Sequence, residues 1–141
     1  MTPKKKMIIV GANSIAGQRA ASYFCHEYDC LLLDFNASKL KVTQKTYAPN
    51  ATILPFDITS TVHLVGLVAY LKRRGNFDYV LNLLDYPEED DNIALVYKVN
   101  LLGTKQLHNY LFPLIAPDGI IINISNLTPP LPPLAPDIFL L

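Results

Sequence analysis

Two glycines and one aspartate in the first third of the chain have the types and spacing of a phosphate- and ribose-binding site. Gly11 ends a short apolar run, and Gly17 follows where a missing side chain lets a helix approach a sheet or a pyrophosphate approach the helix. The N–H groups and partial positive charge of a helix N-terminus point to the same place. Asp34 ends the next apolar run, where a carboxylate can accept hydrogen bonds from ribose hydroxyls. Together these residues indicate a dinucleotide site.

The residue that follows the aspartate favours NAD over NADP. Asp34 would repel a 2′-phosphate, and Phe35 stands where an Arg or Lys would receive one. The alternative interpretation is a tight turn in an α/β protein that binds nothing, because a fold alone never guarantees a site.

The elements that must position these residues alternate along the chain. Short, β-branched runs predict strands and periodic stretches predict helices. The predicted strands cover 6–10, 30–35, 51–57, 77–84 and 120–125, and the predicted helices 15–28, 37–47, 60–75 and 91–112. Strands alternating with helices predict the α/β class: a doubly wound, Rossmann-like parallel sheet of about five strands in the order 3-2-1-4-5, with helices on both faces.

Two helices carry more specific expectations. The spacing in 15–28 predicts one buried face, made of Ile15, Ala16, Arg19, Ala20, Phe24 and Cys25. The helix at 60–75 has Ser60 as a capping residue and basic residues in its last turn. Gly75 occupies the C-terminal position at which helices commonly end in a left-handed backbone conformation.

Composition limits the function classes. The 141 residues are half hydrophobic and only 17% charged, which is typical of a folded domain, and 12 basic side chains balance 12 acidic ones. Because these charges cancel, no net electrostatic field attracts nucleic acid. No apolar run approaches the roughly 20 residues of a membrane span. We expect one NAD(P)-binding domain over 1–126 and a proline-rich, apolar tail over 127–141.

The cysteines do not predict a disulfide framework or a metal site. Cys25, His26 and Cys30 lie close together but fit no standard zinc spacing and lack a fourth ligand. Two cysteines alone indicate free thiols in a reducing cytoplasm, and we expect no metal.

Several segments together resemble the short-chain dehydrogenase/reductase family over nearly the whole chain. The segments are "VGANSIAG" (10–17), "FDIT" (56–59), "DYVLNLLDYP" (78–87), "YKVNLLGT" (97–104) and "PDGIIINISN" (117–126). The first turn keeps the outer glycines of the family motif. Its middle glycine is replaced by Ile15 under the common spacing, or by Ser14 under the spacing of the epimerase-like branch.

The resemblance implies a cofactor site. Asp57 would contact the adenine amino group, Ile58 would line the ring, and only Asn82 survives of the family's Asn-Asn-Ala-Gly segment. The implied cofactor-binding residues are Gly11, Asn13, Ser14, Ile15, Ala16, Gly17, Asp34, Phe35, Asp57, Ile58, Asn82, Leu83 and Leu84.

The catalytic part of the family pattern is missing from this sequence. Asn100 matches the family's helix-bending, proton-relay asparagine, and Ser125 and Asn126 lie where its serine follows strand five. The family's Tyr would fall at Phe139, its Lys would lie beyond Leu141, and neither residue type occurs after 110. The resemblance thus implies an oxidoreductase-like domain without the Tyr-x-x-x-Lys pair. The alternatives are a non-catalytic dinucleotide-sensing or protein-interaction module and an empty Rossmann scaffold.

The fifth predicted strand would lie at the edge of the sheet, where it needs a partner or a covering segment. A long apolar strand at the edge of a sheet favours pairing unless something covers it. We therefore expect either a homo-oligomer or packing of the chain on itself, through the strand-five edge, the helix at 91–112 and the tail at 127–141.

Overall fold

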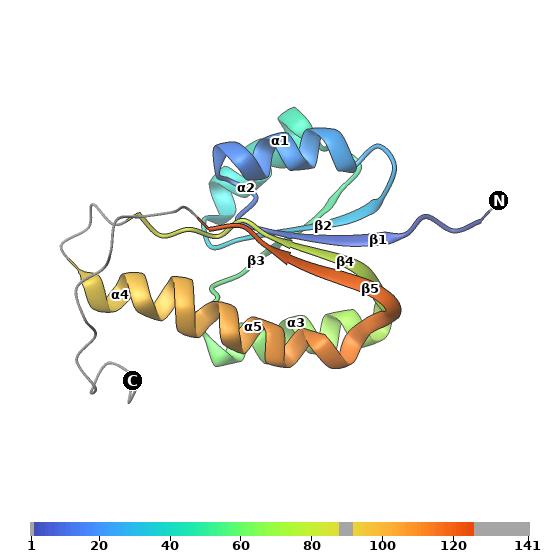
Figure 1. Ribbon diagram of the computed structural model, residues 1–141. Helices are drawn as coiled ribbons and strands as arrows, with labels where there is room; N and C mark the ends of the chain where they lie inside the picture. The colour runs from blue at the N-terminus through green and yellow to red at the C-terminus, as the bar shows by residue number, and fades with distance from the viewer. Residues whose placement is uncertain (1, 88–91, 126–141) are drawn as a thin grey trace.

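Five parallel strands form one sheet in a computed structural model, which describes residues 2–87 and 92–125 (Figure 1). The strand order is β3-β2-β1-β4-β5, as predicted. The strands are β1 (Lys6–Val10), β2 (Asp29–Asp34), β3 (Thr52–Pro55), β4 (Phe77–Asn82) and β5 (Ile115–Asn123). The order reverses between β1 and β4, where open parallel sheets bind their ligands.

Helices cover both faces of the sheet, which confirms the predicted α/β class (Figure 1). One face carries α1 (Ile15–Phe24) and α2 (Ala37–Tyr47). The other face carries α3 (Thr61–Arg74) and a rod built from α4 (Ile93–Tyr97), the π-helix η1 (Lys98–Gly103) and α5 (Thr104–Leu111). A short 3-10 helix, η2 (Phe112–Leu114), leads into β5.

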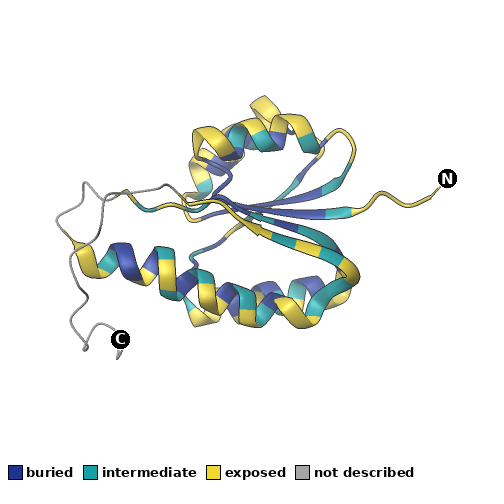
Figure 2. Ribbon diagram, in the orientation of Figure 1, coloured by how far each residue is buried: buried dark blue, intermediate teal, exposed yellow. Residues whose placement is uncertain are grey.

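The central strands are buried on both sides, which explains their continuous apolar runs (Figure 2). Side chains alternate between two cores along each strand. Ile8 and Leu31 pack towards α3 and α5, whereas Ile9, Cys30 and Leu32 pack towards α1 and α2.

The end signals of α3 are confirmed. The Ser60 hydroxyl accepts a hydrogen bond from the His63 amide at 3.3 Å, so it caps the helix. Gly75 follows the helix with φ of 80°, a conformation that other residues rarely adopt.

The predicted face of the first helix was wrong in part, and its predicted end was wrong. Cys25 is buried and Ala20 and Phe24 are partly buried against the same core, as predicted. Ile15 is 75% exposed and Arg19 is exposed, whereas Gly17, Ala21 and Cys25 are buried. The helix packs on the sheet through small residues spaced by four, because these allow close approach. It ends at Phe24 rather than at 28.

The second half of the chain also differs from expectation. The predicted helix at 91–112 is described from Ile93 onwards and contains a π-helix over Lys98–Gly103, which includes Asn100. β5 begins at Ile115 instead of 120, and a register shift opposite Phe77–Tyr79 accommodates the extra residues. In the described part of the chain, no helix has the length and apolar character needed to span a membrane.

Candidate functional site

Two glycines close the turn after β1, and any larger residue at either position would force the backbone around it to move. Gly11 has φ of +78°, and a Cβ there would lie 2.9 Å from the carbonyl carbon of Leu83. A Cβ at Gly17 would lie 2.2 Å from the carbonyl oxygen of Gly11. The backbone of α1 therefore rests directly on the turn, which brings the helix N-terminus to the carboxyl ends of β1 and β4.

Ser14 organises the N-terminus of α1. Its hydroxyl oxygen accepts a hydrogen bond from the Gly17 amide at 2.9 Å, and the hydroxyl donates to the Gly11 carbonyl at 2.8 Å. Among the described residues, the amides of Ile15 and Ala16 have no acceptor. These two donors and the positive end of a ten-residue helix are suited to an anion.

The missing middle glycine causes no backbone strain. No described residue other than glycine has positive φ, so Ser14 and Ile15 both adopt ordinary conformations. The Ile15 side chain lines a groove on the outer side of α1 with Tyr23 and Tyr47, whereas Ser14 lines the cleft beside Gly11. Neither side chain obstructs the turn.

Asp34 connects the turn to the end of β2. Its side chain is buried, and its two oxygens accept hydrogen bonds from the amides of Asn13 at 3.1 Å and Asn36 at 3.2 Å. Each carboxylate oxygen has a second lone pair, so the group can still accept from a ligand. Asp34 also lines the cleft.

Asn13 has a structural role that the sequence did not reveal. Its side chain donates to the Asn36 carbonyl at 3.2 Å and accepts from the Thr43 hydroxyl at 2.9 Å. Both Asn13 and Thr43 are buried. These bonds fix the turn against α2, so part of Asn13's hydrogen-bonding capacity is used within the protein.

A cleft of about 640 Å³ opens at the carboxyl end of the sheet. It brings together nine of the predicted cofactor-binding residues: Gly11, Asn13, Ser14, Asp34, Phe35, Asp57, Ile58, Leu83 and Leu84. Further lining residues that the sequence analysis missed include Lys39, Phe56, Tyr86, Leu95 and Val99. Ile15, Ala16, Gly17 and Asn82 are not among the residues that line it.

Asp57 lies on the far wall of the cleft, after β3. One carboxylate oxygen accepts from the amide of Thr59 at 2.9 Å and from its hydroxyl at 2.7 Å. The Asp57 amide donates to Nδ1 of His63 at 2.9 Å, which ties the loop to α3. The carboxylate is thus held in a fixed orientation.

Asn82 fixes the loop that faces Gly11. It is buried and donates to the hydroxyl of Thr104 at 3.2 Å and the side-chain oxygen of Asn123 at 3.1 Å. Its own side-chain oxygen accepts from the Leu84 amide at 3.2 Å. The side chain therefore links β4, β5 and α5, and it positions Leu84 from behind the cleft.

Asn100 holds the next part of the same loop. Its side-chain oxygen accepts from the Tyr86 amide at 2.7 Å, and its Nδ2 donates to the Tyr86 carbonyl at 3.1 Å and to Asp85 at 3.3 Å. Ser125 is exposed at the end of the described chain, and Asn126 and the predicted tail at 127–141 lie outside it. Within the described residues, no three His, Cys, Asp or Glu side chains gather as metal ligands.

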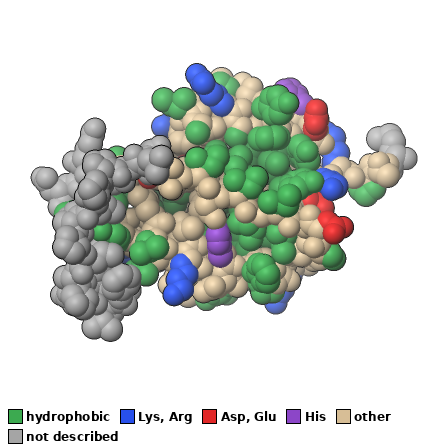
Figure 3. Space-filling model, viewed as in Figure 1, with side chains coloured by type: hydrophobic (Ala, Val, Ile, Leu, Met, Phe, Trp, Pro, Cys, Tyr) green, Lys and Arg blue, Asp and Glu red, His purple; other side chains and the backbone are tan. Residues whose placement is uncertain are grey.

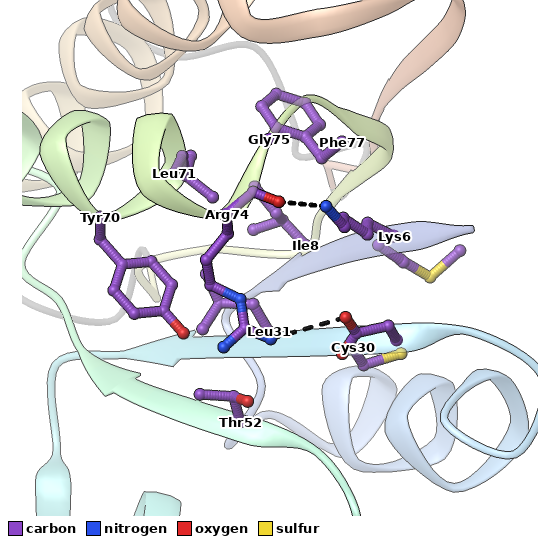
Figure 4. Close-up of a pocket in the computed structure, with 12 residues that line it drawn as sticks. Lys6, Ile8, Cys30, Leu31, Thr52, Tyr70, Leu71, Arg74, Gly75 and Phe77 are labelled. Atoms are coloured by element: carbon purple, nitrogen blue, oxygen red, sulfur yellow. Dashed lines mark hydrogen bonds and ion pairs between the residues drawn. The ribbon is translucent and has the colours of Figure 1, made fainter. Parts of the chain in front are cut away.

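A second, much smaller cavity of about 20 Å³ lies at the opposite end of the sheet (Figure 4). Arg74 pairs with Asp29 at 3.5 Å, and the Lys6 ammonium donates to the Arg74 carbonyl. A space of this size holds no more than a water molecule, so it is a packing gap.

Several solved structures share this fold. Neither a protein-family model nor a curated protein matches the sequence. An NAD+-bound xylitol dehydrogenase has 22% sequence identity and a TM-score of 0.73, over 86% of this chain and 52% of its own. An actinorhodin polyketide ketoreductase with NADPH has 24% identity and a TM-score of 0.71, over 85% of this chain and 52% of its own. A short-chain dehydrogenase/reductase (glucose/ribitol dehydrogenase) from Brucella melitensis has 20% identity and a TM-score of 0.72, over 86% and 54%.

The chain therefore has the fold of the first part of short-chain dehydrogenases/reductases, a Rossmann-like α/β sheet. It spans about half the length of the solved structures that it matches.

Proposed function

We propose that the chain is a short-chain dehydrogenase/reductase-like domain that binds a nicotinamide dinucleotide. The observation that carries the proposal is one cleft lined by Gly11, Ser14 and the fixed carboxylate of Asp34, with the two unused amides of the α1 N-terminus directly after Ser14. The pyrophosphate would bind at the amides of Ile15 and Ala16, and the adenosine ribose at Asp34. Two of the solved structures with this fold are of enzymes bound to NAD+ or NADPH, which supports the cofactor class.

NAD is the cofactor we propose. The Asp34 carboxylate at the ribose position would repel a 2′-phosphate, and Phe35 beside it offers no charge. Lys39, at the start of α2, is the one cation that lines the described cleft. If NADPH bound more tightly than NADH, Lys39 would be the group that receives the phosphate.

We do not assign hydride transfer to these residues alone. The fold is that of oxidoreductases, whose general acid is the Tyr of a Tyr-x-x-x-Lys pair after strand five. This sequence holds no such pair, so its residues would bind the cofactor without supplying a general acid. A dinucleotide-sensing or protein-interaction module is the second candidate. Two free cysteines favour a reducing compartment, and we propose the cytoplasm.

Titration of the purified chain with NADH and, separately, NADPH tests the proposal. We expect saturable NADH binding by calorimetry, with NADPH weaker by about tenfold or more, a difference of at least ~1.4 kcal/mol in binding free energy. Lys39→Ala should leave NADH binding unchanged and weaken any residual NADPH binding. If neither nucleotide bound the folded chain, the empty-scaffold interpretation would replace the proposal.

We also propose that the chain associates with a second copy through β5. This strand lies at the sheet edge; Ile120 and Ile122 within it are 52% and 48% exposed, and Ile124 directly after it is 53% exposed. Figure 3 views the molecule from the side of β5 and shows hydrophobic side chains gathered there. An exposed apolar edge strand is a template for pairing with another chain.

Sedimentation of Ile122→Lys tests this association. We expect a dimer for the unmodified chain and a monomer for the variant, because a lysine on an edge strand opposes pairing. Val62→Lys is the matched control, since Val62 is 78% exposed on α3, away from β5. A monomeric unmodified chain, or equal loss in both variants, would contradict the assignment to β5.

A further inference from the structure

Three carboxylates line the described cleft, and one of them lies apart from the other two. Asp34 ends β2 and Asp57 follows β3, whereas Asp85 comes after β4. The sheet order places β4 on one side of β1 and the strands β2 and β3 on the other. The glycine turn after β1 therefore separates Asp85 from the other carboxylates. Of the described residues, Asp85 is the charged group that the β4 side contributes to the cleft.

The Asp85 carboxylate is held by Asn100. Nδ2 of Asn100 donates to one oxygen of Asp85 at 3.3 Å. The Asn100 side chain is itself fixed, because its oxygen accepts from the Tyr86 amide at 2.7 Å and its Nδ2 also donates to the Tyr86 carbonyl at 3.1 Å. The negative charge of Asp85 thus has a defined position at the β4 side of the cleft, on a residue that is exposed to solvent.

The walls of the cleft beside Asp85 are apolar. Leu83 and Val99 are buried, and Leu84 and Leu95 are partly buried against the core under α3 and α5. Apolar side chains with a few placed polar groups are typical of sites for small molecules. This side of the cleft is therefore suited to a flat ring, with a carboxylate at its margin.

The nucleotide proposed above would reach this side of the cleft. In open α/β sheets a dinucleotide binds across the point at which the strand order reverses, which is between β1 and β4 here. With the adenosine ribose at Asp34 and the pyrophosphate at the amides of Ile15 and Ala16, the second nucleoside would extend towards the loop after β4. The nicotinamide ring would then lie on the side of the cleft that carries Asp85.

We infer that Asp85 makes the cleft select the oxidised cofactor, NAD+, over NADH, an inference that rests on the proposed dinucleotide binding. The pyridinium ring of NAD+ carries a positive charge that the dihydronicotinamide ring of NADH lacks, and the diphosphate is the same in both. The Asp85 carboxylate therefore attracts the ring of NAD+ alone. Because Asp85 is exposed, water weakens the attraction, and the preference is about threefold to fivefold, as for an exposed ion pair.

Calorimetric titration of the full chain with NAD+, NADH and ADP-ribose tests the inference. At low ionic strength, we expect the unmodified chain to bind NAD+ about threefold to fivefold more tightly than NADH. The preference should shrink when sodium chloride is raised to about 0.5 M, because salt screens the attraction. ADP-ribose lacks the nicotinamide ring and reports the binding of the rest of the nucleotide.

Asp85→Asn removes the charge and keeps an oxygen that accepts from Asn100. In this variant NAD+ should lose affinity until it binds as NADH does, whereas ADP-ribose should lose none. The comparison of NAD+ with NADH cancels any effect of Asp85 on the diphosphate. Asp118→Asn is the matched control and should keep the preference, since Asp118 is exposed in β5 before Ile120, which pairs with Tyr79 near the start of β4.

The outcomes separate this inference from the proposed function. Equal affinities of the unmodified chain for NAD+ and NADH, or a preference that persists in Asp85→Asn, would overturn the role of Asp85 and leave the dinucleotide site in place. If none of the three ligands bound the folded chain, the proposed function would fall as well. The unmodified chain alone gives the first of these results, so the inference can be refuted even if a variant fails to fold.

Discussion

Replacing Gly17 with alanine is expected to destabilise the chain by about 3 kcal/mol, at the upper end for overpacking of a rigid site. The added Cβ would lie 2.2 Å from the Gly11 carbonyl oxygen and 2.7 Å from the Ala12 Cα. Both are backbone atoms, so no side-chain rotation relieves the clash. Either α1 or the turn must move. Urea unfolding followed by circular dichroism measures the change in free energy.

Gly66 provides the matched control within a helix. An added Cβ there has no neighbour within 4 Å, because the residue lies on the exposed side of α3. Gly66→Ala should stabilise the chain by about 1 kcal/mol through helix propensity alone. Similar effects of the two substitutions would contradict the view that close contact, rather than helix propensity, determines the residue at 17.

Gly17→Ala should also weaken dinucleotide binding under conditions where the variant is still folded. Moving α1 away from the turn would displace the amides of Ile15 and Ala16, which are the proposed anion donors. Calorimetric titration with NADH at a temperature below the variant's unfolding transition would measure this loss. Gly66→Ala should bind NADH as the unmodified chain does.

The parts of the fold that the sequence predicted rest on local signals. Continuous apolar runs identified the strands, and their alternation with helices gave the order 3-2-1-4-5. Ser60 and Gly75 set the ends of α3 through bonds and backbone angles within a few residues. Such features need no knowledge of distant segments, and so the sequence reveals them.

The errors concern features that depend on distant partners. The buried face of α1 is made of Gly17, Ala21 and Cys25, because the helix lies too close to the sheet for larger side chains. Hydrophobicity alone favoured Ile15 in that face. The early start of β5 likewise depends on β4, which pairs with Ile115 through an irregular register.

The candidate site was predictable in composition more than in geometry. Gly11, Asp34 and Asp57 lie at or just after the ends of strands, and all three line the cleft. The sequence did not reveal that Asn82 acts from behind the cleft through Thr104 and Asn123, which lie 22 and 41 residues away. Hydrogen bonds of this kind leave no periodic pattern in a sequence.

Replacing Asp34 with alanine is expected to have a double effect, on stability and on binding. Two backbone amides would lose their acceptor, that of Asn13 buried and that of Asn36 only partly buried; an unsatisfied buried donor costs about 1–3 kcal/mol, and a partly buried one costs less. We therefore expect destabilisation of about 2–4 kcal/mol by urea unfolding. NADH affinity should fall by at least about tenfold, since hydrogen bonds to a charged group contribute about 1.5–3 kcal/mol.

Asp29 offers the control for Asp34, at the other end of the same strand. Its carboxylate pairs with Arg74 at 3.5 Å with both side chains partly exposed, and such pairs contribute about 0–1 kcal/mol. Asp29→Ala should thus change stability little and leave NADH binding intact. Asp34→Asn separates the two effects at Asp34, because its amide oxygen retains one acceptor but no charge. If folded Asp34→Ala bound NADH as tightly as Asp29→Ala did, the carboxylate would serve only to hold the turn, and the ribose would have to bind elsewhere in the cleft.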